Sequence, residues 1–136
     1  MTDQASIRRI NPPQLGEPPG YSQIVGVAAR HLFFIAGQTA LNATGEVVGK
    51  GDFAAQAEQV FHNLGVALKA IDCTATNLVK LTVFMRDMSN LDAYREARNR
   101  FFATVNLPAP PAITLIEVSR LYGPDFLIEI EAVAAA

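Results

Sequence analysis

Two glutamates near the end of the chain, Glu129 and Glu131, have the spacing that most suggests chemistry. On a strand, residues two apart point to the same face, with Cα atoms about 6.5–7 Å from each other. Carboxylates in an apolar run must be paired, protonated or exposed. The pattern fits a general acid or base that positions water, and Glu117 is expected as a neighbour across the turn. Solvent exposure, or pairing with Arg86 or Arg120, is the plainer alternative and stays open.

The other reactive side chains show no comparable pattern. His31 and His62 lack metal-ligand spacing, and we expect His31 at a strand end and His62 facing solvent. Cys73 is the single cysteine, so no internal disulfide can form, and without a neighbouring His or Lys it is expected to be buried. The Gly49-Lys50-Gly51 segment is no P-loop, because no GxxxxGK[ST] pattern follows a strand. These patterns predict no metal site and no cofactor.

The elements that position these residues follow from hydrophobic periodicity. A helix is predicted over 53–71, with Asp52 as its N-cap, because apolar residues recur there every three or four positions. A second helix is predicted over 91–105, where the charge run at 95–100 is typical of a solvated face. Segment 11–20 holds four prolines and is read as an ordered loop. Strands are predicted over 6–10, 21–27, 31–36, 78–85, 113–119 and 126–134, and the valines at 47–48 permit a further short one.

This order of elements predicts an α+β sandwich, with one mixed sheet of about five to six strands and two helices on one face. Two helices cover only one face of such a sheet. The predicted strands at 31–36 and 126–134 are nevertheless apolar on both faces. A large apolar face is rarely left in water, so we expect other copies of the chain to cover it. The alternative is a monomer whose second face is covered by the N-terminal loop.

Length and composition fit a single domain over residues 1–136. Half of the residues are apolar and 18% are charged, which excludes disordered, collagen-like and coiled-coil chains. The net charge of −2, without a Lys/Arg cluster, argues against a nucleic-acid partner. No apolar run approaches the roughly 20 residues of a membrane span, and the start does not resemble a signal peptide. The expectation is a cytoplasmic protein with no membrane partner.

Five segments in this order resemble the RidA/YjgF family of reactive-intermediate deaminases, also described as endoribonuclease L-PSP proteins. They are residues 19–23, 34–38, 80–87, 117–121 and 128–132. The resemblance extends from about residue 6 to residue 134. It implies a chorismate-mutase-like fold and a homotrimer. In such a trimer the three sheets enclose a central barrel, and a cleft at each subunit interface binds a small-molecule ligand.

The resemblance also implies an activity and a set of site residues. Deaminating members hydrolyse enamine or imine intermediates to 2-keto acids and ammonia. By position, Glu129 matches the glutamate that is proposed to orient the attacking water. Tyr21 matches the tyrosine that lines the pocket after the Pro-rich loop, and Gly37 and Gln38 match the Gly-Gln turn.

At other positions the chain departs from the family pattern. Family members with a carboxylate-binding arginine read Pro-Ala-Arg followed by Ser or Thr, whereas residues 111–114 read Pro-Ala-Ile-Thr. Ile113 therefore stands in place of the arginine, Leu115 in place of a small or thiol residue, and Ala36 in place of a serine. Arg95 falls near an asparagine position of the second helix. The carboxylate-binding wall becomes apolar, unless Arg95 supplies a cation from another direction.

Two functional hypotheses follow. In the first, the chain is a Rid-type hydrolase or deaminase whose substrate range is altered by Ile113. In the second, it is a non-catalytic trimer that binds a small metabolite or acts as a regulator. A chorismate-mutase-like isomerase has less support, because its dicarboxylate substrate requires cations that the wall lacks. A ribonuclease has less support still, because no histidine pair or basic groove accompanies the acidic composition.

Overall fold

Both predicted helices form, and the first begins at its predicted cap. In the computed structural model, which describes residues 5–136, α1 (Phe53–Ala70) follows Asp52, whose carboxylate accepts a hydrogen bond from the Ala55 N–H over 3.1 Å. The second helix, α2 (Leu91–Phe102), ends three residues before the predicted boundary. There the Thr104 hydroxyl donates to the Phe101 carbonyl over 2.6 Å and satisfies one of the free carbonyls of the last turn.

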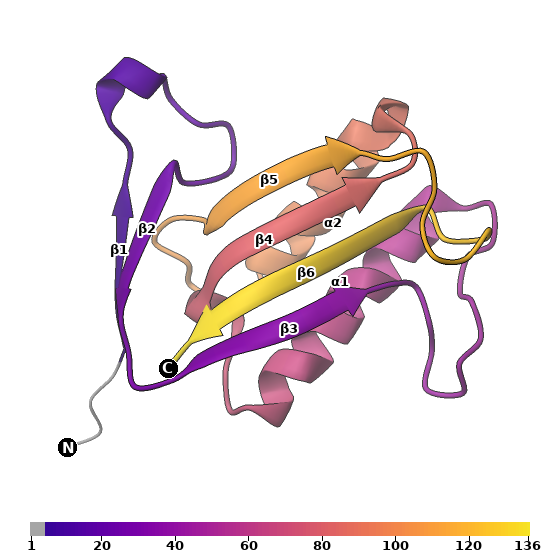
Figure 1. The fold of residues 1–136 in the computed structure, drawn as a ribbon, viewed down its shortest axis with the longest axis horizontal. Coiled ribbons are helices and arrows are strands. Elements are labelled where there is room, and N and C mark those ends of the chain that lie inside the picture. The colour runs from indigo at the N-terminus through magenta and orange to yellow at the C-terminus, as the bar shows by residue number, and fades with distance from the viewer. Residues whose placement is uncertain (1–4) are drawn as a thin grey trace.

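Six strands form in the described residues, and they divide into two groups (Figure 1). An antiparallel hairpin contains β1 (Ser6–Ile10) and β2 (Ile24–Ala28). The larger sheet has the order β3-β6-β4-β5, with β4 and β5 parallel and the other pairs antiparallel. Its strands are β3 (Leu32–Gln38), β4 (Leu78–Met85), β5 (Ala112–Glu117) and β6 (Ile128–Ala135).

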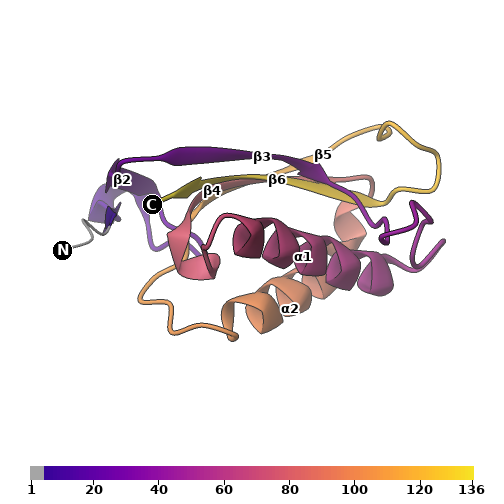
Figure 2. The same cartoon turned by 90° about the horizontal axis from the view of Figure 1, so that it is seen from below.

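The predicted α+β class, with a mixed sheet and two helices on one face, is confirmed (Figure 2). The single sheet of five to six strands is replaced by a four-stranded sheet and a separate hairpin. The hairpin segment meets the sheet at one isolated bridge, between Ser22 and Ala112. The ladder cannot extend there because Pro110 and Pro111 have no N–H to donate. The short strand expected at 47–48 is reduced to a bridge between Leu41 and Val47.

Side chains of β6 alternate between two environments. On the face toward α1 and α2, here called the helix face, β6 residues are at most 3% exposed; they are Ile128, Ile130, Ala132 and Ala134. On the opposite face, here called the open face, the residues between them are partly or fully exposed; they are Glu129, Glu131 and Val133. The helices lie only beneath the helix face (Figure 2). The hydrophobic core therefore sits between the sheet and the two helices.

The open face stays uncovered in the single chain. Phe34 of β3 is 79% exposed there, and it pairs with Val133 across the sheet. The monomer alternative requires segment 11–20 to cover this face, but the exposure of Phe34 shows that it does not. The homo-oligomer stays a prediction.

Neither described helix is long and apolar enough to cross a membrane. The cytoplasmic location stays a prediction.

Candidate functional site

The predicted site residues fall into two groups on opposite faces of the sheet. The first group lines a cavity of about 240 Å³, here called the helix-side pocket. Its walls come from the Pro-rich loop, α2 and β5; they are Pro19, Tyr21, Leu91, Tyr94, Arg95, Arg98, Ile113 and Leu115. The second group consists of Gly37, Gln38 and Glu129, where β3 and β6 meet. Four of the seven predicted residues thus share one pocket, and three lie together elsewhere.

Parallel pairing with β4 decides which way β5 presents its side chains. Ile113 is paired with Leu81 and Leu115 with Val83. Leu81 and Val83 are fully buried under the helices, and paired residues of a sheet share a face. Ile113 and Leu115 therefore project to the helix face, where they line the pocket. Thr114, between them, projects to the open face with Thr82, its partner.

A glycine holds the Pro-rich loop against the pocket and sets the position of Tyr21. Gly20 has φ +84°, a conformation that other residues rarely adopt, and a Cβ atom there would collide with the Arg98 guanidinium. Ser22 fixes the following backbone, because its N–H donates to the Pro111 carbonyl over 2.9 Å and its hydroxyl to the Pro110 carbonyl over 2.5 Å. Tyr21 is thus placed at the border of the helix-side pocket.

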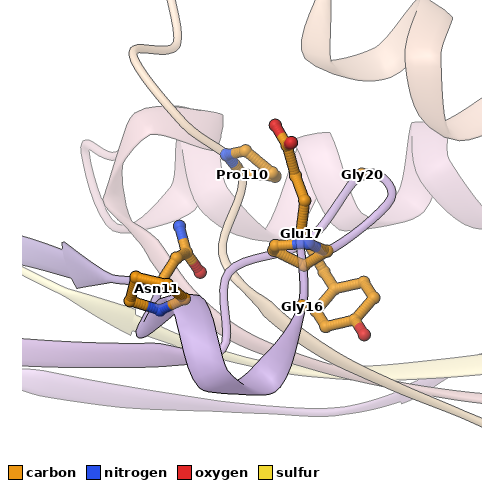
Figure 3. Close-up of a pocket in the computed structure, with 8 residues that line it drawn as sticks. Asn11, Gly16, Glu17, Gly20 and Pro110 are labelled. Atoms are coloured by element: carbon orange, nitrogen blue, oxygen red, sulfur yellow. The ribbon is translucent and has the colours of Figure 1, made fainter.

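A second, larger cavity also has Tyr21 in its wall, and Figure 3 shows the residues that line it. It has a volume of about 560 Å³, and the Pro-rich loop supplies most of its walls. Asn11 and Glu17 are its polar residues at the loop, and the Asn11 side-chain oxygen accepts a hydrogen bond from the Gln23 N–H over 2.7 Å. Since Tyr21 lines both cavities, a movement of the loop would alter both.

In the helix-side pocket one buried hydroxyl lacks a hydrogen-bond partner, and one buried guanidinium lacks a carboxylate partner among the described residues. Tyr94 is 1% exposed, and its hydroxyl has no hydrogen-bond partner. Burial raises the pKa of this phenol, while the charge of Arg98 opposes the rise. Arg98 is 9% exposed, and its guanidinium lies 5.7 Å from the centre of the Tyr94 ring. The side-chain acceptor that it reaches is Asn99 Oδ1, at 3.3 Å from Nε and 3.2 Å from Nη2.

Arg98 is the charged pocket residue that the sequence interpretation missed. The charge run at 95–100 was expected to be a solvated face. A usable signal was nevertheless present, because Arg98 lies four residues after Tyr94 and seven after Leu91, on the apolar stripe of α2. Arg95, the predicted cation, is more exposed, at 44% of its side chain, and it lies 3.7 Å from Asp92.

In the second group, the Glu129 side chain lies against the backbone of Gly37. A Cβ atom at Gly37 would overlap the Glu129 carboxylate, so only glycine permits this approach. The pairing of β3 with β6 shifts register between Ile35 and Gln38, which marks an irregularity at this point. The Gln38 side-chain amide donates to the Ala36 carbonyl over 3.0 Å. Gly37 and Glu129 therefore form one local unit.

The surroundings of Glu129 favour its protonated form. Burial raises the pKa of its carboxyl group, and the negative charge of Glu131 adds to the rise. In the described residues neither carboxylate is paired with Arg86 or Arg120. Arg86 instead donates to the Pro124 carbonyl over 3.2 Å. A partly buried, unpaired carboxyl with a raised pKa is typical of a general acid or base.

The prediction that Glu117 neighbours these glutamates is wrong. The strand order places β4 between β5 and β6, so the strand of Glu117 does not touch theirs. Its carboxylate accepts a hydrogen bond from the Met88 N–H over 2.9 Å and caps the turn before α2. Local sequence suggested an antiparallel pair because only a short segment connects the two strands, whereas β4 pairs with both.

The cysteine and both histidines lie where the sequence predicts. Cys73 is buried and free, and burial raises the pKa of its thiol, with Asp72 adding to the rise. His62 is exposed on α1, and His31 is exposed just before β3. Within residues 5–136, no three His, Cys, Asp or Glu side chains come together in a way that could hold a metal ion.

Comparisons with known proteins extend over both groups. The endoribonuclease L-PSP family model matches residues 15–136. A RutC family protein of Synechocystis is 37% identical over 131 residues, which cover 95% of this chain and 96% of that protein. The human 2-iminobutanoate/2-iminopropanoate deaminase is 33% identical over 114 residues, 84% of this chain and 78% of that protein. The crystal structure of the Rid family protein YyfB of Yersinia pestis matches with a TM-score of 0.85 and 34% identity, covering 96% of this chain and 98% of that one.

Proposed function

The chain belongs to the endoribonuclease L-PSP (RidA/RutC) family, and from this premise we propose that it hydrolyses an imine, an enamine or a related small metabolite. The active form in this proposal is a homotrimer with a cleft at each subunit interface. Similarity to the human deaminase supports the reaction type. The presence of Tyr21, Gly37 and Glu129 at the positions that the resemblance implies supports the location of the site.

The observation that carries the proposal is the placement of the two groups on opposite faces of one sheet. Ile113 and Leu115 project to the helix face, and Glu129 projects to the open face. One copy of the chain therefore cannot bring Glu129 to the helix-side pocket through its own sheet. β5 is an edge strand, so a second copy can approach the pocket beside it and contribute its own Glu129. Burial of the exposed apolar residues on the open face would favour association of the copies.

In the proposed mechanism Glu129 acts as a general base and then as a general acid. Its carboxylate accepts a proton from a water molecule while the water oxygen forms a bond to the imine carbon and the C=N electron pair moves to nitrogen. Glu129 then returns the proton to this nitrogen. Glu129 next takes the remaining hydroxyl proton and passes it to the amino nitrogen. The C–N bond breaks with its electron pair going to nitrogen, ammonia leaves, and the carbon–oxygen bond becomes a carbonyl. A carboxyl with a raised pKa suits both steps, because it holds the accepted proton more firmly than an ordinary glutamate and can still return it.

Ile113 and Leu115 set the proposed substrate range. They form an apolar wall where the resemblance implies an arginine, so the substrate side chain meets hydrocarbon there. The same wall is the observation that favours the second candidate function. In that alternative the trimer binds a small metabolite, or regulates through it, without converting it.

Imine hydrolysis in vitro tests the proposal. An amino-acid oxidase generates 2-iminopropanoate or a bulkier imino acid, and semicarbazide traps whatever the protein does not hydrolyse. We expect wild-type protein to reduce the trapped product and Glu129→Gln to lower the rate by about 10²–10⁴-fold. Glu46→Gln, in an exposed turn, is the control and should match the wild type.

Three outcomes separate the alternatives. If Glu129→Gln is fully active, Glu129 is not the general base and acid of the reaction. An inert wild type together with an active Ile113→Arg would mean that the scaffold is competent but that its natural ligand is not a simple imino acid. If both proteins are inert while a metabolite still raises the melting temperature, the binding function is favoured.

A further inference from the structure

We propose that Arg98 holds the carboxylate of the ligand in the helix-side pocket, and that this ligand is a small monocarboxylate with an apolar side group. The inference deepens the proposed function, because it names the residue that would bind the substrate's acid group. It can be tested separately, since binding of a stable carboxylate requires no turnover.

The first argument is the burial of an arginine without a carboxylate. Arg98 is 9% exposed, and in residues 5–136 it forms no ion pair. Its described hydrogen bonds use two of the five guanidinium donors, both toward Asn99 Oδ1. A buried charge without a counter-charge is costly, so proteins retain one mainly where a partner arrives. A ligand carboxylate would be such a partner, since the remaining donors form a planar fork that matches it.

The second argument is a neighbouring hydroxyl that also lacks a partner. The Tyr94 hydroxyl is buried and unbonded, and Tyr94 lines the same pocket as Arg98. One ligand oxygen can accept from both groups, which would satisfy two buried donors together. A buried guanidinium without a counter-charge and a neighbouring buried hydroxyl on the wall of one cavity together favour an anion site there.

The third argument is that the guanidinium is held in place before any ligand binds. One side of it lies over the Tyr94 ring, at 5.7 Å from Arg98 Cζ to the ring centre. Its other neighbour is the backbone of Gly20, which approaches so closely that a Cβ atom would collide. A cation fixed between a ring and a loop loses little freedom when a ligand binds, and this favours affinity.

Cavity size and wall chemistry define the ligand class. A volume of about 240 Å³ suits a small organic acid. Ile113, Leu115 and Leu91 supply an apolar wall. The pocket therefore combines one buried cation with hydrocarbon, and this is the complement of a monocarboxylate that carries a short apolar chain.

Arg98 fits this role better than Arg95. The Arg95 side chain is 44% exposed and lies near Asp92, so water and a carboxylate screen its charge. The charge of Arg98 acts in a drier environment, where an ion pair is stronger. Arg95 is placed to add a long-range attraction at the rim of the pocket.

Calorimetric titration with 2-oxobutanoate, a stable small carboxylate, tests the inference. We expect Arg98→Met to bind 2-oxobutanoate about tenfold to a hundredfold more weakly than the wild-type protein does. Arg98→Lys should recover part of the loss, because it restores the charge without the planar fork. Arg100→Met is the matched control: Arg100 lies two residues further along α2, is exposed and pairs with Glu58, so affinity should change less than twofold.

Tyr94→Phe gives a second readout if Arg98→Met fails to fold. This variant removes one oxygen atom and keeps the ring under the guanidinium, and we expect a loss of several-fold in affinity. Equal affinity of the wild type, Arg98→Met and Tyr94→Phe would overturn the inference. So would a wild type that does not bind 2-oxobutanoate, or an equal loss in Arg100→Met.

The same variants separate this inference from the proposed function. If the wild type hydrolyses imines and Arg98→Met does so with an unchanged KM, the deaminase stands and the role of Arg98 fails. If no imine is hydrolysed but 2-oxobutanoate binds in an Arg98-dependent way, the anion site stands and the deaminase fails. Glu129→Gln should lose turnover while it retains binding.

Discussion

The two faces of β6 carry different kinds of residue and meet different surroundings. Toward the helices, Ile128 and Ile130 are fully buried against the core. Toward the open face, Glu129 and Glu131 stand at the alternate positions, with Phe34 exposed on the neighbouring strand. A period of two thus separates the residues that stabilise the single chain from those available for chemistry and association. The two sets should respond differently to mutation.

The largest difference between the faces should appear in stability. Ile130→Ala removes a fully buried side chain from the helix face, and we expect the free energy of unfolding to fall by about 2–5 kcal/mol. Val133→Ala, on the open face of the same strand, should cost less than about 1 kcal/mol in the single chain. Urea unfolding of both variants at a concentration where the protein is monomeric measures the contrast. Equal losses would mean that the two faces are equally packed.

Association of the chains should depend on the open face. Phe34→Asp places a charge on its most exposed apolar residue, and each interface should lose about 1.5–3 kcal/mol of hydrophobic stabilisation. Sedimentation velocity is expected to give a trimer for the wild type and a folded, smaller species for Phe34→Asp. Val66→Asp, on the exposed surface of α1, is the control and should remain trimeric. A monomeric wild type would contradict the proposed assembly directly.

A smaller effect is expected where the backbone approaches the open-face carboxylate. Gly37→Ala adds a Cβ atom that overlaps Glu129, so the carboxylate must move while the fold persists. A misplaced catalytic group reduces turnover, here by about ten- to a hundredfold in kcat, without a matching loss of stability. Gly26→Ala in β2, where an added Cβ atom meets open space, should leave kcat unchanged. If Gly37→Ala keeps the wild-type kcat, the close contact between Gly37 and Glu129 is not needed for catalysis.

The smallest expected effect is a change in pH dependence. Burial is the larger cause that raises the pKa of Glu129, and the negative charge of Glu131 adds to the rise. A general base must be ionised, so activity falls as the pH drops through that raised pKa. Glu131→Gln removes the like charge, lowers the pKa of Glu129 and should move the acid limb of the kcat/KM profile to lower pH. A limb that stays in place, or moves to higher pH, would mean that the two carboxyl groups do not interact.

Local patterns were sufficient for the helices and for most strand positions. The Asp52 cap and the apolar stripe of α1 act within one segment, so the helix could be predicted from that segment alone. The edges moved by a few residues because pairing partners decide where a ladder stops. β5 begins at Ala112, next to Pro111, and the prolines before it also kept the hairpin out of the larger sheet.

Pairing between distant segments could not be predicted in the same way. The position of β4 between β5 and β6 separates Glu117 from Glu129, although β5 and β6 are consecutive along the chain. The direction of Ile113 depends on its partner in β4, and a shift of one residue would have turned it to the open face. The resemblance supplied the site residues, but only the register assigned them to faces. Arg98 was missed because its charge was weighted above its position on the buried stripe of α2.

The division of the site between two faces has a genetic consequence. If each cleft joins the pocket of one copy to the Glu129 of the next, two defective alleles can compensate for one another. Chains with Glu129→Gln keep an intact pocket, and chains with Arg98→Met keep an intact glutamate. In a closed ring of three that contains both kinds, one junction of the three unites the sound halves. Co-expression of two inactive proteins should then restore up to about one third of the activity per mixed trimer, a complementation that a site built within one chain could not give.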